Sequence, residues 1–238
     1  MEKKRISTGI PGLDPLLGGG FPACKSYLVT GKPGTGKSIF CMQFILSGLL
    51  GGEKAVYVTV DEKPSDIVEE AASLGWNLIK FVEERRLMIL DASPFFSGRG
   101  GPVARGGSLD VGKTVSDLAN YVKRMEASRV VIDPVGPLIG SSDSSSATQE
   151  YARTLVHALK DHMGTTNLLT SYNSGGRPGG MAVEEYMVAG VIELSISRLR
   201  ERLTRTLMVR KMRGTYIDLT EHQFGIFQEK GIVLKQML

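Results

Sequence analysis

The stretch Gly31-Lys32-Pro33-Gly34-Thr35-Gly36-Lys37-Ser38 decides the fold of this 238-residue chain. It has the form G-x-x-x-x-G-K-[ST], in which each fixed residue type has a task at its spacing. The glycines let backbone N–H groups turn inward around phosphate oxygens. Lys37 can reach the β- and γ-phosphates of a nucleotide, and the Ser38 hydroxyl can ligate Mg²⁺. The eight residues are therefore candidates for binding a nucleotide together with magnesium.

The residues on either side of this loop support the same interpretation. Residues 26–30 form a short β-prone run, and residues 38–46 form a largely apolar segment with helical character. A strand, a glycine-rich turn and a helix N-terminus in this order place the positive end of the helix dipole on the phosphates. A glycine-rich turn without a ligand is the less favoured alternative.

Further along the chain, strand and helix patterns alternate. Apolar, β-branched runs occur at 55–60, 87–91, 129–133 and 166–171, and helical patterns at 64–74, 114–127 and 148–163. This alternation predicts an α/β fold with a mostly parallel sheet and helices on both faces. Beyond Gly190 we expect a C-terminal β-hairpin from residues 191–196 and 203–210, and a last short strand at 224–227. No segment resembles an interdomain linker, so residues 1–238 are expected to form one domain.

Three carboxylates follow predicted strands and are candidates for the chemistry of phosphate hydrolysis. Asp133 ends the continuous apolar run 129–133, where a carboxylate can hold Mg²⁺ beside the phosphate loop. Asp61 and Glu62 follow the run 55–60, and either one can activate an attacking water. Alternation along a strand would point only one of the two inward, and the sequence leaves that choice open.

Composition narrows the class of protein. The chain has 29 Lys+Arg against 25 Asp+Glu and a net charge of +4, a mild excess that does not by itself indicate nucleic acid. The basic stretch 198–213 is more typical of a solvated or subunit-facing strand.

Two cysteines without a CxxC pair exclude a zinc ribbon and argue against a disulfide framework, and both thiols are expected to be buried. The most apolar segment, 39–50, is too short and interrupted to span a bilayer, so we expect a cytoplasmic protein without a membrane partner.

The order of these motifs resembles the KaiC-like branch of the RecA/RadA superfamily of P-loop ATPases. The resemblance covers nearly the whole chain and includes the segments 7–14, 17–22, 183–186, 190–194, 211–215 and 222–226. It implies a RecA-like core that binds ATP and Mg²⁺, with Asp61 and Glu62 as paired catalytic carboxylates and Asp133 on the Walker B strand. It also implies a homohexameric ring with ATP between subunits. In such a ring, Lys211 and Arg213 would reach the γ-phosphate of ATP held by the adjacent subunit.

Three departures from the family pattern refine these expectations. Asp61 stands where the family usually has Glu, which shifts more of the base role to Glu62. Pro134 follows Asp133 where the family commonly has Ser. The chain carries Glu184-Glu185-Tyr186 where the second half of clock-type KaiC has phosphorylatable residues. The predicted function is therefore a single-domain ATPase that acts as a ring-shaped switch or motor, and autokinase activity is disfavoured.

Two other functions remain open from the sequence. One is a DNA-binding recombinase paralogue, based on the fold resemblance and on Arg99, Arg105 and Arg177 in glycine-rich loops. The other is a signalling module that binds ATP, hydrolyses little and acts through an unknown protein partner. The choice between a hexamer and a filament, and between ATP and GTP, also stays open.

Overall fold

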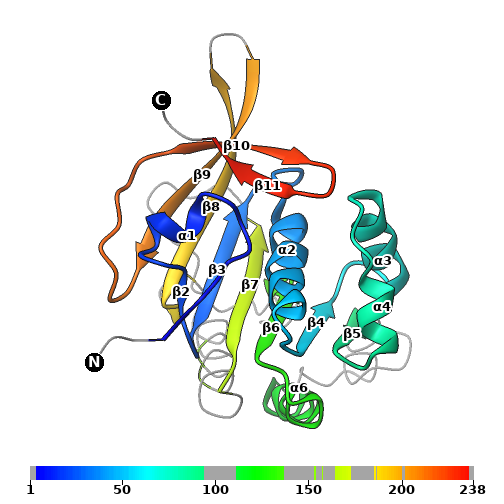
Figure 1. Ribbon diagram of the computed structural model, residues 1–238. Coiled ribbons are helices and arrows are strands. Elements are labelled where there is room, and N and C mark those ends of the chain that lie inside the picture. The colour runs from blue at the N-terminus through cyan, green and yellow to red at the C-terminus, as the bar shows by residue number, and fades with distance from the viewer. Residues whose placement is uncertain are drawn as a thin grey trace, which may run out of the picture.

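The computed structural model describes residues 4–93, 111–136, 164–172, 187–199 and 202–235, together with Arg153, His157 and Glu185. Within these residues the chain forms a mixed α/β fold around a nine-stranded sheet, in the order β11-β10-β9-β8-β3-β7-β6-β4-β5 (Figure 1). The strands are β3 (Ser26–Gly31), β4 (Ala55–Thr59), β5 (Leu87–Asp91), β6 (Arg129–Asp133), β7 (Thr166–Tyr172), β8 (Gly190–Leu199), β9 (Arg202–Met212), β10 (His222–Phe227) and β11 (Gly231–Leu234). The helices are α1 (Leu13–Leu16), α2 (Lys37–Leu50), α3 (Pro64–Ser73), α4 (Leu78–Glu83) and α6 (Val111–Met125), and β1 (Arg5–Ile6) pairs with β2 (Phe21–Pro22).

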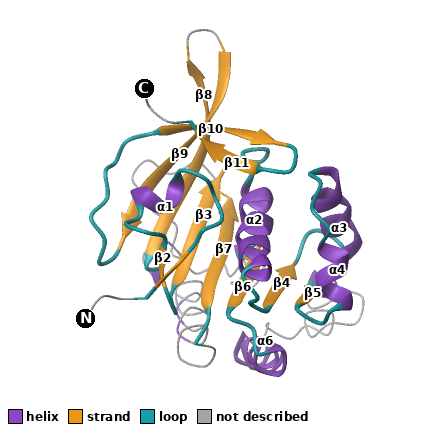
Figure 2. Cartoon of the chain, viewed as in Figure 1, coloured by secondary structure: helices purple, strands orange, loops and turns teal. Residues whose placement is uncertain are grey.

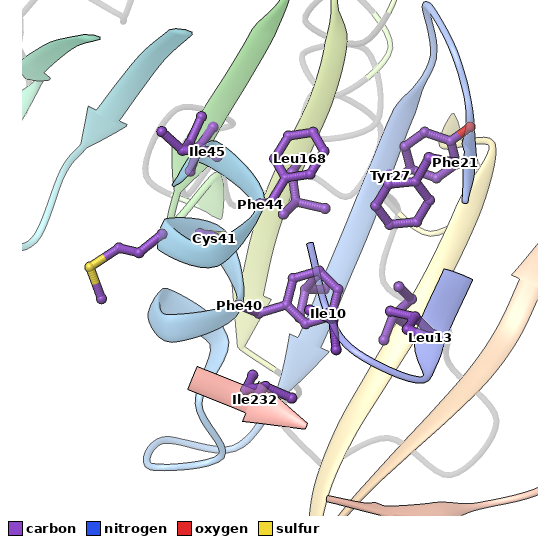
Figure 3. Packing of buried hydrophobic residues seen from close by; sticks show 14 of the residues in the cluster. Ile10, Leu13, Phe21, Tyr27, Phe40, Cys41, Phe44, Ile45, Leu168 and Ile232 are labelled. Carbon is purple, nitrogen blue, oxygen red and sulfur yellow. The ribbon is translucent and has the colours of Figure 1, made fainter. Parts of the chain in front are cut away.

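The predicted parallel sheet is confirmed, and burial on both faces explains its composition. Strands β8, β3, β7, β6, β4 and β5 pair in parallel, and every residue of β3, β4 and β6 is buried. Alternate residues belong to two separate cores, as Tyr57 packs with α2 whereas Val56 and Val58 pack with Leu118 of α6. Figure 3 shows Phe40 and Phe44 on the side of α2 that faces the sheet. Helices therefore cover both faces, as the continuous apolar runs of these strands require.

The C-terminal hairpin is also confirmed, and it is longer than expected. Strands β8 and β9 pair antiparallel over 10 and 11 residues, and their far ends extend beyond the rest of the sheet (Figure 2). Strand β11 was not predicted from the sequence; it pairs with β10 and adds a second hairpin at the sheet edge. The expected helix at 148–163 lies outside the described residues apart from Arg153 and His157, both helical.

Two smaller expectations are corrected. Cys24 is exposed, because it lies in the turn between β2 and β3, whereas Cys41 is buried against the sheet as expected. Strand β4 ends at Thr59, so Asp61 and Glu62 lie in the following turn and strand alternation does not govern their direction. In the part of the chain that the structure describes, no helix has the length and hydropathy to cross a bilayer.

Gln43 joins the helix behind the phosphate loop to both ends of the described chain. Its side-chain nitrogen lies 2.8 Å from the carbonyl oxygen of Gly9, 3.0 Å from that of Lys230 and 3.1 Å from that of Ile232. Its side-chain oxygen accepts a hydrogen bond of 2.8 Å from the backbone N–H of Ile232. The amide thus binds the N-terminal segment and strand β11 to α2.

We expect Gln43→Ala to lower the free energy of unfolding by about 2–3 kcal/mol, because buried backbone groups lose their partners. Urea denaturation followed by circular dichroism measures the change. Gln228→Ala, in the exposed turn before β11, is the matched control and should change stability by less than about 0.5 kcal/mol. Equal stability of the two variants would contradict the role assigned to Gln43.

Candidate functional site

A cavity of about 300 Å³ lies at the carboxyl ends of β3 and β6, where the phosphate loop joins α2. Its lining brings together residues from six parts of the chain: Pro33, Gly34, Gly36, Lys37, Ser38, Ile39, Glu62, Glu70, Asp133, Tyr172, Arg205 and Ile226. Open parallel sheets bind ligands at the carboxyl ends of their strands, so this position is the expected one for a nucleotide. Seven of these residues were predicted from the sequence as site residues: five belong to the phosphate loop, and Glu62 and Asp133 are the other two.

The loop has the backbone shape that its glycines permit. Gly34 and Gly36 adopt φ of 79° and 104°, in the region that disfavours side chains. Gly36 caps the N-terminus of α2 without a side-chain hydrogen bond, which leaves the first N–H groups of the helix available to an anion. The Thr35 hydroxyl donates to the carbonyl of Lys32 at 2.8 Å and closes the turn.

The side chain of Lys37 folds back onto the first residues of the phosphate loop. Its Nζ donates to the carbonyl oxygens of Gly31 at 2.9 Å and Lys32 at 3.1 Å. The same Nζ lies 4.8 Å from the centroid of the Tyr172 ring. Burial lowers the pKa of Lys37, although the nearby Asp133 carboxylate opposes that shift. The amine is thus positioned beside the cavity by contacts that a phosphate can replace.

Asp133 ends β6 and is held rigidly at the cavity wall. One carboxylate oxygen accepts a 2.7 Å hydrogen bond from the hydroxyl of Tyr57, and the other accepts a hydrogen bond from the hydroxyl of Thr170. The residue is only 9% exposed. Asp133 and the Ser38 hydroxyl provide oxygen ligands, the kind that Mg²⁺ prefers, and this ion commonly takes its remaining ligands from water and phosphate. The donor set therefore fits magnesium.

The two carboxylates after β4 have different surroundings. Glu62 lines the cavity, and the Thr59 hydroxyl holds its turn by donating to the Glu62 carbonyl at 2.7 Å. Partial burial and the negative charges of Asp133, Asp66 and Asp61 raise the pKa of Glu62. Asp61 is exposed, and its carboxylate accepts a 3.2 Å hydrogen bond from the hydroxyl of Tyr172. Glu62 is thus the carboxylate of the pair that faces the cavity.

Lys211 and Arg213 lie away from this cavity because of the strand register. Lys211 pairs with Val191 of β8, which pairs with Leu28, three residues before the end of β3 at Gly31. At about 3.3 Å per residue, this register places Lys211 roughly 10 Å back along the sheet from the loop. The Lys211 amine donates instead to the backbone carbonyl of Glu185 at 2.7 Å.

Five cavity residues were not predicted as site residues: the polar residues Arg205, Glu70 and Tyr172, and the apolar residues Ile39 and Ile226. Arg205 lies on the same antiparallel strand as Lys211 but at the carboxyl-end edge of β3, and its Nη2 lies 3.4 Å from the carbonyl of Gly34. The sequence placed Arg205 only within a basic stretch, because strand pairing and not spacing brings it to the loop. Burial and the charges of Glu62 and Asp133 raise the pKa of Glu70. Helical spacing from Asp66 to Glu70 was the only signal for this residue.

Comparison with known proteins gives one consistent family. The family model described as "ATPase: KaiC" matches residues 6–237. A UPF0273 protein of Methanopyrus kandleri is 36% identical over 96% of this chain and 91% of its own length. A crystal structure of a KaiC-like protein from Pyrococcus horikoshii superimposes with a TM-score of 0.83 at 31% identity, covering 99% of this chain and 100% of that one.

The clock proteins among the relatives are about twice as long. The circadian clock oscillator protein KaiC of Synechococcus elongatus is 35% identical over 98% of this chain, but the match covers only 46% of that protein. The similarity to the clock protein therefore concerns one half of its length.

Proposed function

Because the chain belongs to the KaiC family of ATPases, we propose that it binds ATP with Mg²⁺ at the phosphate loop and hydrolyses the terminal phosphate. One observation carries this proposal: Lys37, Ser38, Asp133 and Glu62 line a single cavity although they come from three separate parts of the chain. We further propose that residues 1–238 act as one ATPase domain.

Each of these residues has a distinct task in hydrolysis. The N–H groups of the loop and the Lys37 amine hold the β- and γ-phosphates, so that negative charge developing in the transition state meets fixed positive charge. Ser38 and Asp133 would hold Mg²⁺, which when bound neutralises charge on the β- and γ-oxygens. Glu62 orients a water toward the γ-phosphate and accepts its proton, a role that its raised pKa favours at neutral pH. Arg205 adds a positive charge at the loop from the same chain.

Steady-state release of inorganic phosphate from the pure protein, with Mg²⁺ and with a chelator, tests the proposal. We expect turnover of ATP that depends on Mg²⁺. Tight binding of ATP without measurable turnover would instead favour the low-turnover signalling module. Arg99, Arg105 and Arg177, the arginines on which the DNA-binding alternative was partly based, lie outside the described residues.

We propose that the active form is a ring in which Lys211 and Arg213 act on the ATP of an adjacent subunit. The position of Lys211 supports this arrangement, because its register places it roughly 10 Å back along the sheet from its own loop and it does not line the cavity. Cations supplied by a neighbour would make hydrolysis depend on assembly.

Mixing two inactive variants tests this arrangement. Lys37→Ala and Arg213→Ala subunits should each be inactive alone and regain activity in mixed assemblies. With equal, random mixing, about one site in four has an intact loop and an intact neighbouring arginine, because the interface is heterologous. Mass measurement verifies the mixed assemblies. No recovery in verified mixtures would contradict a role of Arg213 across the interface.

A further inference from the structure

Tyr172 contacts both halves of the proposed catalytic machinery. It is the last residue of β7, where it pairs with Gly31 at the start of the phosphate loop. Its ring lies 4.8 Å from Lys37 Nζ, and its hydroxyl lies 3.2 Å from a carboxylate oxygen of Asp61. The residue also lines the cavity, yet it is 51% exposed. A half-exposed side chain contributes little to a core, so these two contacts are what its aromatic ring and hydroxyl provide.

The contact with Lys37 competes with a nucleotide. A cation over an aromatic face is attracted by the ring quadrupole, and the carbonyls of Gly31 and Lys32 complete the hydrogen bonding of the amine. A γ-phosphate attracts the same amine more strongly because it carries full negative charge. Binding of the triphosphate therefore draws Lys37 away from the tyrosine ring.

The contact with Asp61 reaches the turn that carries the base. Asp61 and Glu62 are consecutive, and the Thr59 hydroxyl ties the Glu62 backbone to the end of β4. The Tyr172 hydroxyl donates to the Asp61 carboxylate, and burial together with the Asp61 charge raises the pKa of Tyr172, so the hydroxyl stays protonated as a donor. Tyr172 thus makes a hydrogen bond to the residue that directly precedes Glu62 in the turn.

We propose that Tyr172 is a positioning residue that links the phosphate loop to the acidic turn, its ring holding Lys37 in the empty site and its hydroxyl orienting the Asp61–Glu62 turn. This inference rests on the proposed function, since it assigns a response to the nucleotide that the function requires. When a phosphate binds the Lys37 amine, the Tyr172 ring loses its contact with that amine, and the tyrosine then positions the turn that carries the base, Glu62.

Two substitutions separate the two contacts. Tyr172→Phe keeps the ring and loses the hydroxyl, so kcat should fall about three- to tenfold while KM for ATP stays within about twofold. Tyr172→Leu loses both contacts, so kcat should fall by the same roughly three- to tenfold as in Tyr172→Phe. In Tyr172→Leu the affinity for the non-hydrolysed analogue AMPPNP with Mg²⁺ should also rise about two- to fivefold, because the ring no longer competes for Lys37. Tyr121→Phe, on the exposed face of α6, is the matched control and should leave all three values unchanged.

A double substitution tests the path through Asp61. If the hydroxyl acts on the turn, Tyr172→Phe combined with Asp61→Asn should reduce kcat no further than the larger single effect. Independent, multiplying effects would overturn the link to Asp61. An unchanged kcat in Tyr172→Phe, or weaker AMPPNP binding in Tyr172→Leu, would overturn the proposal while the ATPase function stands. A wild-type protein that neither binds nor hydrolyses ATP would overturn both.

Discussion

Replacing Lys37 by alanine is expected to reduce ATP turnover by about 100- to 1000-fold, the scale seen when one preorganised donor to a transition-state oxyanion is removed. The structure places the Lys37 amine at the cavity wall by two carbonyl contacts from its own loop. Alanine keeps the helix start, because α2 begins at this position and alanine is a good helix former. The loss should therefore fall on catalysis and phosphate binding, and not on folding. Phosphate release at saturating ATP measures it.

Lys80→Ala, on the exposed surface of α4, is the matched control and should turn over ATP like the wild type. Thermal unfolding of both variants shows whether the fold is kept. Turnover by a folded Lys37→Ala variant at more than about a tenth of the wild-type rate would contradict the assigned site.

Glu62→Gln is expected to lower kcat by about 100-fold or more, because a positioned general base contributes roughly 10²–10⁴ to a rate. Glutamine keeps the size of the side chain but cannot accept the proton of the attacking water. Asp61→Asn should have a smaller effect, since Asp61 contacts Tyr172 while Glu62 lines the cavity. Glu69→Gln, exposed on α3, is the control and should leave kcat unchanged. A larger loss for Asp61→Asn than for Glu62→Gln would reverse the assignment of the base.

Glu62 also determines the expected pH dependence of ATP turnover. A base must be deprotonated, so kcat/KM should rise with pH and level off above the pKa of Glu62. Partial burial and three neighbouring carboxylates raise this pKa, so the rise should lie above the usual range for glutamate. Asp61→Asn removes one of those negative charges and should shift the rise to lower pH. A pH profile that is identical in Asp61→Asn and the wild type would contradict this coupling.

The core of the fold could be predicted from local patterns. The runs 55–60 and 129–133 correspond to β4 and β6, because strands buried on both faces need continuous apolar residues, and the run 87–91 corresponds to the half-buried edge strand β5. Strand β11 was missed because Gly231–Leu234 is short and lacks a pattern of its own, and pairing with β10 is what forms it. Such short edge strands depend on a neighbouring strand more than on their composition.

What the sequence by itself determined is the set of candidate residues: a glycine-rich loop ending in Lys37 and Ser38, a strand-end carboxylate at Asp133, and an acidic pair after β4. These follow from residue types at fixed spacing along one strand or turn. Only the tertiary structure decided which residues share the cavity. Glu62 and not Asp61 lines it, Arg205 reaches it while Lys211 on the same strand does not, and Tyr172 connects Lys37 to Asp61. The physical reason is that strand pairing joins residues far apart in the chain, and its register is set by packing across the whole sheet.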